Sequence, residues 1–242
     1  MILSIDTATI GGSVCLTRNG TVLASRLGDA SISHSNSLLK DINDCLDQAG
    51  LSLGSVDLLA AASGPGSFTG LRIGLATVKA LAATLQTSCV GIPTLHAVAH
   101  AAGQSDATVA LLLAGRGEVF VQLLSVSPDG RVIPLDEPAH LSPQDVVDKY
   151  ASLKTLKWAG PGAHSYRGLL ESSAQEQGID LGYKDVTETA LYEGWRLAPA
   201  VENLSLHVAA LALYKYETDE VDDALSLNAI YVRPSDAELK CP

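Results

Sequence analysis

The chain is poor in aromatic and in charged residues, so its interior has to be built from small aliphatic side chains. Aromatic residues make up 5% of the 242 residues and charged residues 18%, whereas hydrophobic residues make up 47%. That hydrophobic content is enough for a sizeable core built mainly from Ala, Leu and Val. The length predicts one large domain or two smaller lobes.

Cysteine is also scarce, and no two cysteines are close in sequence. The four lie at Cys15, Cys45, Cys89 and Cys241. Without a Cys-x-x-Cys pair, the sequence offers neither a disulfide framework nor a zinc framework. Isolated thiols of this kind are typical of a reducing compartment, and we expect a cytoplasmic protein.

Basic residues are in the minority. The 16 Lys and Arg residues face 27 Asp and Glu residues, which gives a formal net charge of −11. Because phosphate binding needs a surface of Lys and Arg, the chain is not expected to hold a nucleic acid by itself. The acidic balance also fits the simpler role of keeping a soluble protein in solution.

No segment resembles a signal peptide or a membrane anchor. The first residues carry no basic stretch, and Asp6 interrupts the apolar start. The longest uncharged run, from Ala80 to Ser105, contains Pro93, two histidines and several polar residues, which makes it a poor membrane span. We therefore expect no membrane association.

The first hundred residues alternate between strand-like and helix-like apolar patterns, with Asn19-Gly20 as a hairpin turn. The expected elements are strands at 1–6, 13–17 and 21–26, a helix at 35–49, a strand at 56–62, a helix at 70–85, a strand at 89–92 and a helix at 94–102. Three antiparallel strands followed by helix, strand, helix, strand and helix form half of an actin-like ATPase fold.

A second lobe is expected to begin near Asp106 and to repeat this order in degraded form. Its expected elements are strands at 109–113, 118–125, 131–134 and 157–159 and helices starting at 143 and 166, followed by a late apolar helix at 204–216. The predicted domains are an N-terminal lobe at 1–104 joined by the late helix near 204–217, a C-terminal lobe at 105–203, and a tail at 218–242. We predict a two-lobed α/β protein of the actin-like ATPase (ASKHA) fold with a degenerate second lobe and a cleft between the lobes.

The stretch Gly64–Gly74, Gly-Pro-Gly-Ser-Phe-Thr-Gly-Leu-Arg-Ile-Gly, joins a strand pattern to a helix pattern. Its four glycines let the backbone approach another group closely, and a helix start favours an anion. Thr69 is the expected N-cap, and Arg72 falls in the first turn, where a cation needs a partner beyond its own helix. The stretch matches neither a P-loop nor the dinucleotide fingerprint. A tightly packed strand–helix connection is the plainer alternative.

Taken whole, this stretch resembles the signature of the TsaB (YeaZ) family, whose bacterial members act in the threonylcarbamoyladenosine modification of tRNA. Four other segments resemble the same family, in the same order. They are Ile2-Leu3-Ser4-Ile5-Asp6-Thr7-Ala8-Thr9, His34-Ser35-x-x-Leu38-Leu39, Gly115-Arg116-Gly117-Glu118-Val119-Phe120 and Tyr231-Val232-Arg233-Pro234-Ser235. The family's usual Asp-Ala-Arg before the Gly-Glu pair is absent, and Ala229 replaces the usual Pro before the Tyr-x-Arg motif.

The resemblance implies a non-catalytic accessory subunit that pairs with the catalytic TsaD subunit. With the ATPase TsaE, that complex transfers a threonylcarbamoyl group from an adenylate to an adenosine of tRNA. The chain would form a homodimer when alone and would meet tRNA only through the complex. The resemblance implies no tightly bound cofactor and leaves open ATP or ADP at the partner interface. The alternative is a stand-alone actin-like kinase or a metal-dependent (glyco)peptidase; a kinase needs a second phosphate-binding turn, and only Gly160-Pro161-Gly162 stands there.

Two sets of candidate site residues follow. A nucleotide would meet Asp6, Thr7, Gly66 and Ser67. For Asp6 the favoured alternative is a structural role, in which the carboxylate caps the turn after the first strand. The partner interface would include His34, Leu38, Leu71, Arg72, Leu75, Ala76, Lys79 and Ala83. The helix at 70–85 is rich in small residues, which permit close packing against a partner helix or against the chain's own sheet.

His96 and His100 have the i, i+4 spacing of two ligands that share one metal. In the related TsaD subunit, a His-x-x-x-His metal pair follows a similar Gly-Val/Ile strand. Alignment on Val90-Gly91-Ile92 puts that pair at Thr94 and Val98, so the histidines here are out of register by about 200° around the helix. We therefore predict no metal site and no catalytic residue.

Overall fold

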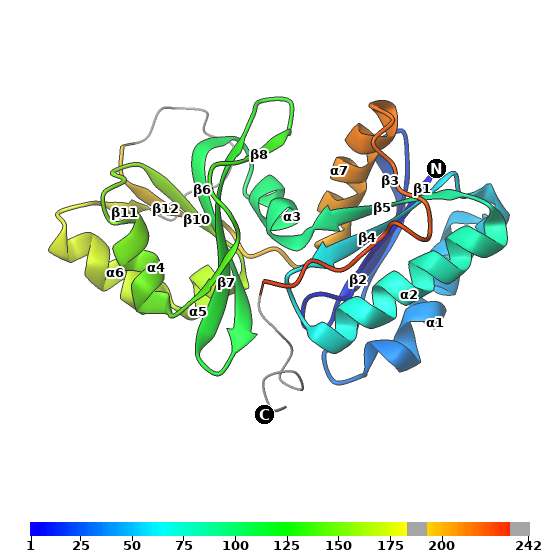
Figure 1. The fold of residues 1–242 in the computed structure, drawn as a ribbon, viewed down its shortest axis with the longest axis horizontal. Helices are drawn as coiled ribbons and strands as arrows, with labels where there is room; N and C mark the ends of the chain where they lie inside the picture. The colour runs from blue at the N-terminus through cyan, green and yellow to red at the C-terminus, as the bar shows by residue number, and fades with distance from the viewer. Residues whose placement is uncertain (183–192, 233–242) are drawn as a thin grey trace. The chain divides into compact units, whose positions relative to one another are not determined.

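A computed structural model describes residues 1–182 and 193–232 (Figure 1). The chain divides into two compact units, here called unit 1 (Met1–Ala97 with Glu202–Tyr231) and unit 2 (Val98–Val201 with Val232). Each unit contains a sheet with its own helices. The α/β class and the actin-like ATPase type of fold are therefore as predicted. The predictions made for Cys241 and for residues 233–235 lie outside the described residues.

Unit 1 is built on a 5-stranded sheet of order β3-β2-β1-β4-β5. The strands are β1 (Ile2–Asp6), β2 (Ser13–Arg18), β3 (Thr21–Leu27), β4 (Leu58–Gly64) and β5 (Ser88–Pro93). The first three pair antiparallel, whereas β4 pairs parallel with β1 and with β5. Every residue of β1 is buried, as expected for a central strand with both faces covered.

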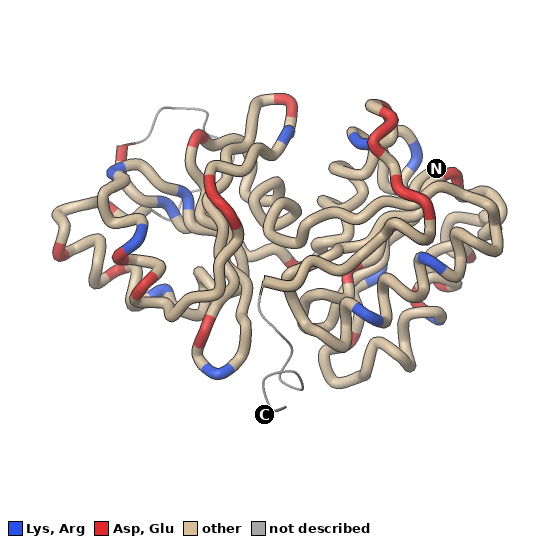
Figure 2. Tube along the Cα trace, in the orientation of Figure 1, with Lys and Arg blue, Asp and Glu red and all other residues tan. Residues whose placement is uncertain are grey.

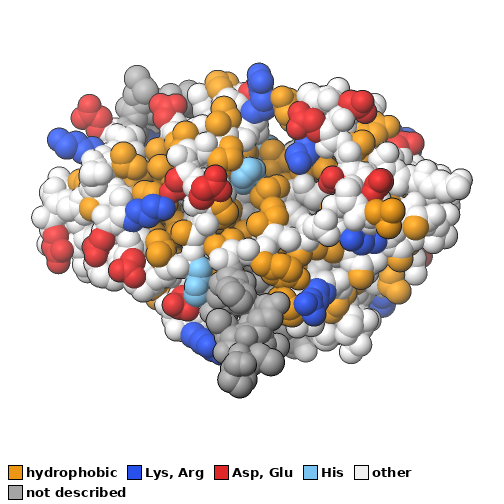
Figure 3. All heavy atoms as spheres, in the orientation of Figure 1, with side chains coloured by type: hydrophobic (Ala, Val, Ile, Leu, Met, Phe, Trp, Pro, Cys, Tyr) orange, Lys and Arg blue, Asp and Glu red, His pale blue; other side chains and the backbone are white. Residues whose placement is uncertain are grey.

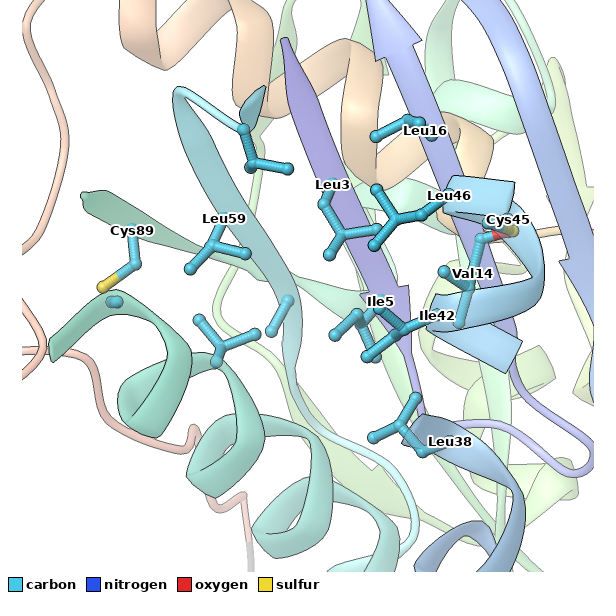
Figure 4. Close-up of a cluster of buried hydrophobic side chains, with 14 of the residues drawn as sticks. Leu3, Ile5, Val14, Leu16, Leu38, Ile42, Cys45, Leu46, Leu59 and Cys89 are labelled. Carbon is cyan, nitrogen blue, oxygen red and sulfur yellow. The ribbon is translucent and has the colours of Figure 1, made fainter. Parts of the chain in front are cut away.

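Helices α1 (His34–Ala49) and α2 (Phe68–Leu85) cover one face of this sheet, and α7 (Ser205–Glu217) covers the other (Figure 1). Figure 4 shows the core on the α1 and α2 side, where Leu3 and Ile5 of β1 meet Ile42 of α1. Ser4 points to the opposite face, and its hydroxyl donates a hydrogen bond of 2.8 Å to the Ser205 carbonyl at the start of α7. Unit 1 also contains a short 3-10 turn, η1 (Leu53–Ser55), and the first half of α3 (Thr94–Ala101).

By length and composition alone, one described helix, α2, could cross a membrane. Its side chains Leu71, Leu75 and Val78 are buried in unit 1, and α2 packs against β4. These three apolar side chains therefore serve packing within unit 1.

Unit 2 is built on a 7-stranded sheet of order β11-β12-β10-β6-β7-β8, with β9 paired to β7. The strands are β6 (Ser105–Gly115), β7 (Glu118–Val126), β8 (Val132–Pro134), β9 (Ala139–Leu141), β10 (Leu156–Ala159), β11 (Leu181–Gly182) and β12 (Trp195–Leu197). The helices are α4 (Pro143–Tyr150), α5 (Pro161–Ser165) and α6 (Arg167–Glu176). Trp158 and Trp195 pack edge to face in the core, with ring centroids 5.1 Å apart.

The sequence pattern missed β9, α5, β11 and β12. Each of these elements has 5 residues or fewer, which is too short to show a period.

Candidate functional site at the β4–α2 loop

The stretch Gly64–Gly74, here called the signature loop, forms the end of β4 and the start of α2. The helix begins at Phe68 and not at Gly70, because its N-cap is Ser67. The Ser67 hydroxyl oxygen accepts a hydrogen bond of 3.2 Å from the Gly70 amide. The prediction of Thr69 as N-cap is therefore wrong. The earlier start also places Arg72 at the fifth helical position, just beyond the first turn.

The turn after β1 packs directly on the start of α2. Thr7 donates a hydrogen bond of 2.7 Å from its hydroxyl to the Gly70 carbonyl, and the Ser67 amide donates one of 2.8 Å to the Ala8 carbonyl. A Cβ atom at Gly70 would lie 1.9 Å from the Thr7 carbonyl oxygen, and one at Gly74 would lie 2.2 Å from the Thr7 hydroxyl. These glycines are needed for the close approach of the chain to itself.

Asp6 is fully buried, and its carboxylate is used within the same turn. It accepts hydrogen bonds from the Ala8 amide at 2.8 Å, from the Thr9 amide at 3.3 Å and from the Thr9 hydroxyl. Burial raises the pKa of the Asp6 carboxyl, and the hydrogen bonds from Thr9 and Ala8 oppose that rise. This is the arrangement of a residue that caps a turn.

The four residues predicted to meet a nucleotide do lie together at this turn. Their polar groups are engaged by the chain itself, as described for Asp6, Thr7 and Ser67. At Gly66, a Cβ atom would lie 2.6 Å from the Ala8 carbonyl oxygen. A phosphate bound here would have to displace these contacts.

His34, the first residue of α1, lies against the same turn. Its Nε2 atom is 3.3 Å from the Thr9 carbonyl oxygen. A Cβ atom at Gly12 would lie 2.8 Å from the His34 ring. The half-buried imidazole therefore ties the start of α1 to the turn after β1.

The residues predicted for a partner interface divide into two groups. Leu38, Leu71 and Leu75 are buried in unit 1, and Figure 4 shows Leu38 among the core side chains. These three face the sheet because they lie on the inner stripe of their helices, so they are not available at the surface of the unit. The other predicted residues are exposed or half-buried, namely His34, Arg72, Ala76, Lys79 and Ala83.

The outward face of α2 carries small side chains. Ala76, Ala80 and Ala83 are all exposed along it. On α1, Leu39 is 62% exposed, and Ile32 just before that helix is 45% exposed. Leu39 was not among the predicted interface residues. The sequence signal for Leu39 was its position next to Leu38. Two consecutive residues of a helix point in different directions, so when Leu38 faces the sheet Leu39 does not.

Tyr231 is brought to the signature loop from a distant part of the chain. The Arg72 guanidinium carbon lies 3.9 Å from the centre of the Phe68 ring. Its Nε donates a hydrogen bond of 3.5 Å to the Tyr231 hydroxyl, and the two aromatic rings are 5.3 Å apart. We call Phe68, Arg72 and Tyr231 the aromatic–arginine cluster. Local sequence spacing holds no signal for it, because Tyr231 follows Arg72 by 159 residues.

The helix α3 carries both histidines of the His-x-x-x-His pattern. Burial lowers the pKa of both, and together with the Lys215 charge it lowers that of His96 to about 4. At the positions aligned with the related metal pair, Thr94 and Val98 are buried, and the Thr94 hydroxyl oxygen accepts a hydrogen bond of 3.0 Å from the Gly64 amide. Within residues 1–182 and 193–232, no group of three or more His, Cys, Asp or Glu is placed to hold a metal ion.

The strand order of unit 1, its flanking helices and the second sheet define a protein of the actin-like ATPase class. The family model TsaD, tRNA N6-adenosine threonylcarbamoyltransferase, matches residues 28–216. The chain is 30% identical over 246 residues to the tRNA threonylcarbamoyladenosine biosynthesis protein TsaB of Escherichia coli (strain K12), a match that covers 100% of this chain and 98% of that protein. The chain therefore belongs to the TsaB (YeaZ) family, which takes part in the biosynthesis of threonylcarbamoyladenosine in tRNA.

Other comparisons agree in fold and family. A solved protein described as similar to the peptidase YeaZ, from Pseudomonas aeruginosa, has a TM-score of 0.74 and 25% identity over 96% of this chain and 99% of that chain. YeaZ from the same organism has a TM-score of 0.71 and 24% identity over 95% and 98%. The tRNA N6-adenosine threonylcarbamoyltransferase of Syntrophobacter fumaroxidans is 32% identical over 136 residues, but these cover only 54% of this chain and 39% of that enzyme.

Proposed function

We propose that the chain is a non-catalytic accessory subunit, which pairs with the catalytic TsaD subunit in the cytoplasmic complex that forms threonylcarbamoyladenosine in tRNA. The proposal depends on how much of two relatives, a TsaB protein and a transferase, the similarity to this chain covers. Similarity to the Escherichia coli TsaB covers 98% of that protein, whereas similarity to the Syntrophobacter transferase covers 39% of that enzyme. The chain is therefore similar to only part of a transferase, but to nearly the whole of a differently named protein of the same pathway. This is what we expect of a supporting subunit.

The chemistry of the described residues supports a non-catalytic role. Buried Thr94 and Val98 stand where the alignment places the metal pair of the transferase, and neither side chain suits a catalytic metal. The carboxylate of Asp6 is enclosed by its own turn. In the proposed complex, TsaD supplies the transferase chemistry, TsaE the ATPase, and tRNA is met only through the assembly. ATP or ADP, where it is held, would lie at the partner interface.

The surface of α1 and α2 supports a helix-mediated interface. Small side chains let two helix backbones approach closely, and Ala76, Ala80 and Ala83 supply them on the outward face of α2. On α1, which is in contact with α2, Leu39 adds exposed apolar area. We propose that this face pairs with TsaD and, in the chain alone, with a second copy.

The test is the affinity of the purified chain for the TsaD subunit of the same organism, measured by calorimetry. Ala76→Trp and Ala83→Trp place a bulky ring on the outward face of α2, so each should weaken binding by about tenfold or more. The matched control is Ala210→Trp, on an exposed position of α7, which should bind as the wild type does. Circular dichroism verifies that the variants fold.

If the wild-type chain does not bind TsaD, the proposed pairing is wrong. Folded Ala76→Trp and Ala83→Trp variants with unchanged affinity would place the interface away from this face of α2.

A further inference from the structure

The segment after α7 runs back along unit 1 and ends at the signature loop (red in Figure 1). Asp222 pairs with Cys89 on the edge strand β5 through two backbone hydrogen bonds of 2.7 and 3.1 Å. Leu227 is buried in the core, and the Ile230 amide donates a hydrogen bond of 2.7 Å to the Ser63 carbonyl at the end of β4. We call Asp222–Tyr231 the C-terminal strap. It holds Tyr231 beside the first turns of α2.

The arginine of the aromatic–arginine cluster is a cation held in place by neutral groups. Arg72 is exposed, and its partners are the face of Phe68 and the hydroxyl of Tyr231. No acidic side chain of the described residues pairs with Arg72. Tyr231 engages Nε, and among the described residues of unit 1 none accepts a hydrogen bond from the two Nη groups. A stacked guanidinium loses less freedom on binding than a mobile one.

The surroundings of Arg72 favour a carboxylate as its acceptor. The next exposed residues along α2 are Ala76 and Ala80, which carry no charge. Lys79 is half-buried, and after the hydrogen bonds from Ser226 and Leu225 its charge also helps to lower the pKa of the Asp223 carboxyl at the start of the strap. A nucleic-acid backbone needs a row of cations, whereas a single planar guanidinium matches a single carboxylate.

We propose that Arg72 binds a carboxylate of the catalytic TsaD subunit, and that Tyr231 is a positioning residue that holds the guanidinium toward it. This inference rests on the proposed function and names the chemistry of its interface. Arginine and tyrosine are enriched among the residues that dominate binding energy at interfaces. The C-terminal strap and the signature loop, distant in sequence, then serve one contact.

The first part of the test compares the affinities of variants of the full chain for TsaD by calorimetry at several salt concentrations. Arg72→Gln should weaken binding by about tenfold and reduce its salt dependence, because it removes a charge-assisted bidentate pair. Arg72→Lys should recover little of that loss, because an ammonium lacks the planar fork. The control Arg18→Gln removes another exposed cation, from β2, and should leave affinity within about twofold of the wild type.

The second part tests the positioning role with a double-mutant cycle. Tyr231→Phe keeps the ring beside Phe68 and removes only the hydroxyl, so it should weaken TsaD binding by about threefold. In the Arg72→Gln background the same change should have no effect, because the group it orients is gone. An equal loss in both backgrounds would show that Tyr231 does not act through Arg72.

Each outcome separates the inference from the proposed function. If the wild type binds TsaD and folded Arg72→Gln binds equally well, the inference that Arg72 binds a carboxylate of TsaD is wrong. The proposed pairing of the chain with TsaD is then unaffected. The same holds where Arg72→Gln alters only self-association, or only the retention of tRNA by the complex. If the wild type does not bind TsaD, the proposed function and this inference fail together.

Discussion

Thr7 and Gly70 illustrate at the residue scale how one missing side chain lets two backbone segments meet. The Thr7 hydroxyl is bonded to the Gly70 carbonyl, and the Thr7 carbonyl faces the position where a Gly70 side chain would begin. The glycines of the signature loop therefore join β1 to α2 inside unit 1. Sequence alone leaves an approach to a ligand and a packed connection as alternatives.

The change Gly70→Ala should lower the free energy of unfolding by about 3 kcal/mol, because the new Cβ atom would lie 1.9 Å from a backbone oxygen that cannot move aside cheaply. Urea denaturation measures the effect. The control is Gly168→Ala on α6, where no atom lies within 4 Å of the added Cβ. There alanine should leave stability unchanged or raise it by up to about 1 kcal/mol. Equal effects at both positions would contradict the packing role of Gly70.

His96 links a single side chain to the pH dependence of stability. Its pKa lies near 4 in the folded chain, below its ordinary value of 6.5, because burial and the Lys215 charge disfavour the imidazolium. Between these pH values the unfolded chain binds more protons, so stability is full above pH 6.5 and falls as pH decreases toward 4. We predict that in His96→Gln the free energy of unfolding decreases by roughly 3 kcal/mol less between pH 6.5 and pH 4 than it does in the wild type. Urea midpoints measured from pH 7 to pH 4 test it, and parallel profiles for the two proteins would contradict it.

At the scale of elements, the C-terminal strap covers part of the edge strand β5. An uncovered edge strand offers unpaired backbone groups to other chains. The pairing of Asp222 with Cys89 occupies some of these groups, and the Gly91 amide lies 3.4 Å from the Asp222 carboxylate. The strap is therefore part of the fold of unit 1, although the sequence pattern sets it apart as a tail.

The anchor of the strap is Leu227, and its neighbour Leu225 provides a matched control. Leu227 is 1% exposed and Leu225 is 88% exposed. Leu227→Ala should lower the free energy of unfolding by about 3 kcal/mol, because it leaves a cavity in the core. Leu225→Ala should change it by less than about 0.5 kcal/mol. Denaturation curves that show equal effects would mean that the strap is not packed as described.

At the scale of the whole molecule, charge is the property that bears on tRNA. Acidic residues gather at the end of α7 and the start of the strap (Figure 2). On the face shown in Figure 3, Lys and Arg side chains stand singly among acidic and neutral ones. Together with the net charge of −11, this distribution offers no continuous basic surface on that face for a phosphate backbone.

We therefore predict that the isolated chain binds tRNA more weakly than about 100 μM at physiological salt. Addition of TsaD should bring both the chain and the tRNA into one complex. Fluorescence anisotropy with labelled tRNA, measured with and without TsaD, tests this. Tight binding by the chain alone, lost at high salt, would show that a basic surface exists elsewhere on the molecule.

Most of the larger elements could be predicted because each contains its own periodic signal. The strand β1, the helix α1 and the Ser142-Pro143 start of α4 are encoded by neighbouring residues. The start of α2 was placed too late, because Ser67 and Thr69 are both good N-cap residues and only the Ser67 hydroxyl reaches an amide. The four candidate nucleotide residues lie together in the fold, but the hydrogen bonds that they make within the chain could not be predicted from their spacing in the sequence.

Residues that are near one another in the chain determine the family and the α/β class. They also show that His96 and His100 are out of register with Thr94 and Val98, the positions aligned with the metal pair of the transferase. The exposed face of α2 cannot be determined in this way, because Gly and Ala carry too weak a hydrophobic signal to distinguish an inward stripe from an outward one. The meeting of Tyr231 with Arg72 also required the folded chain. Two residues separated by 159 positions come together only through the path of α7 and the strap, a property of the packed core and not of any local pattern.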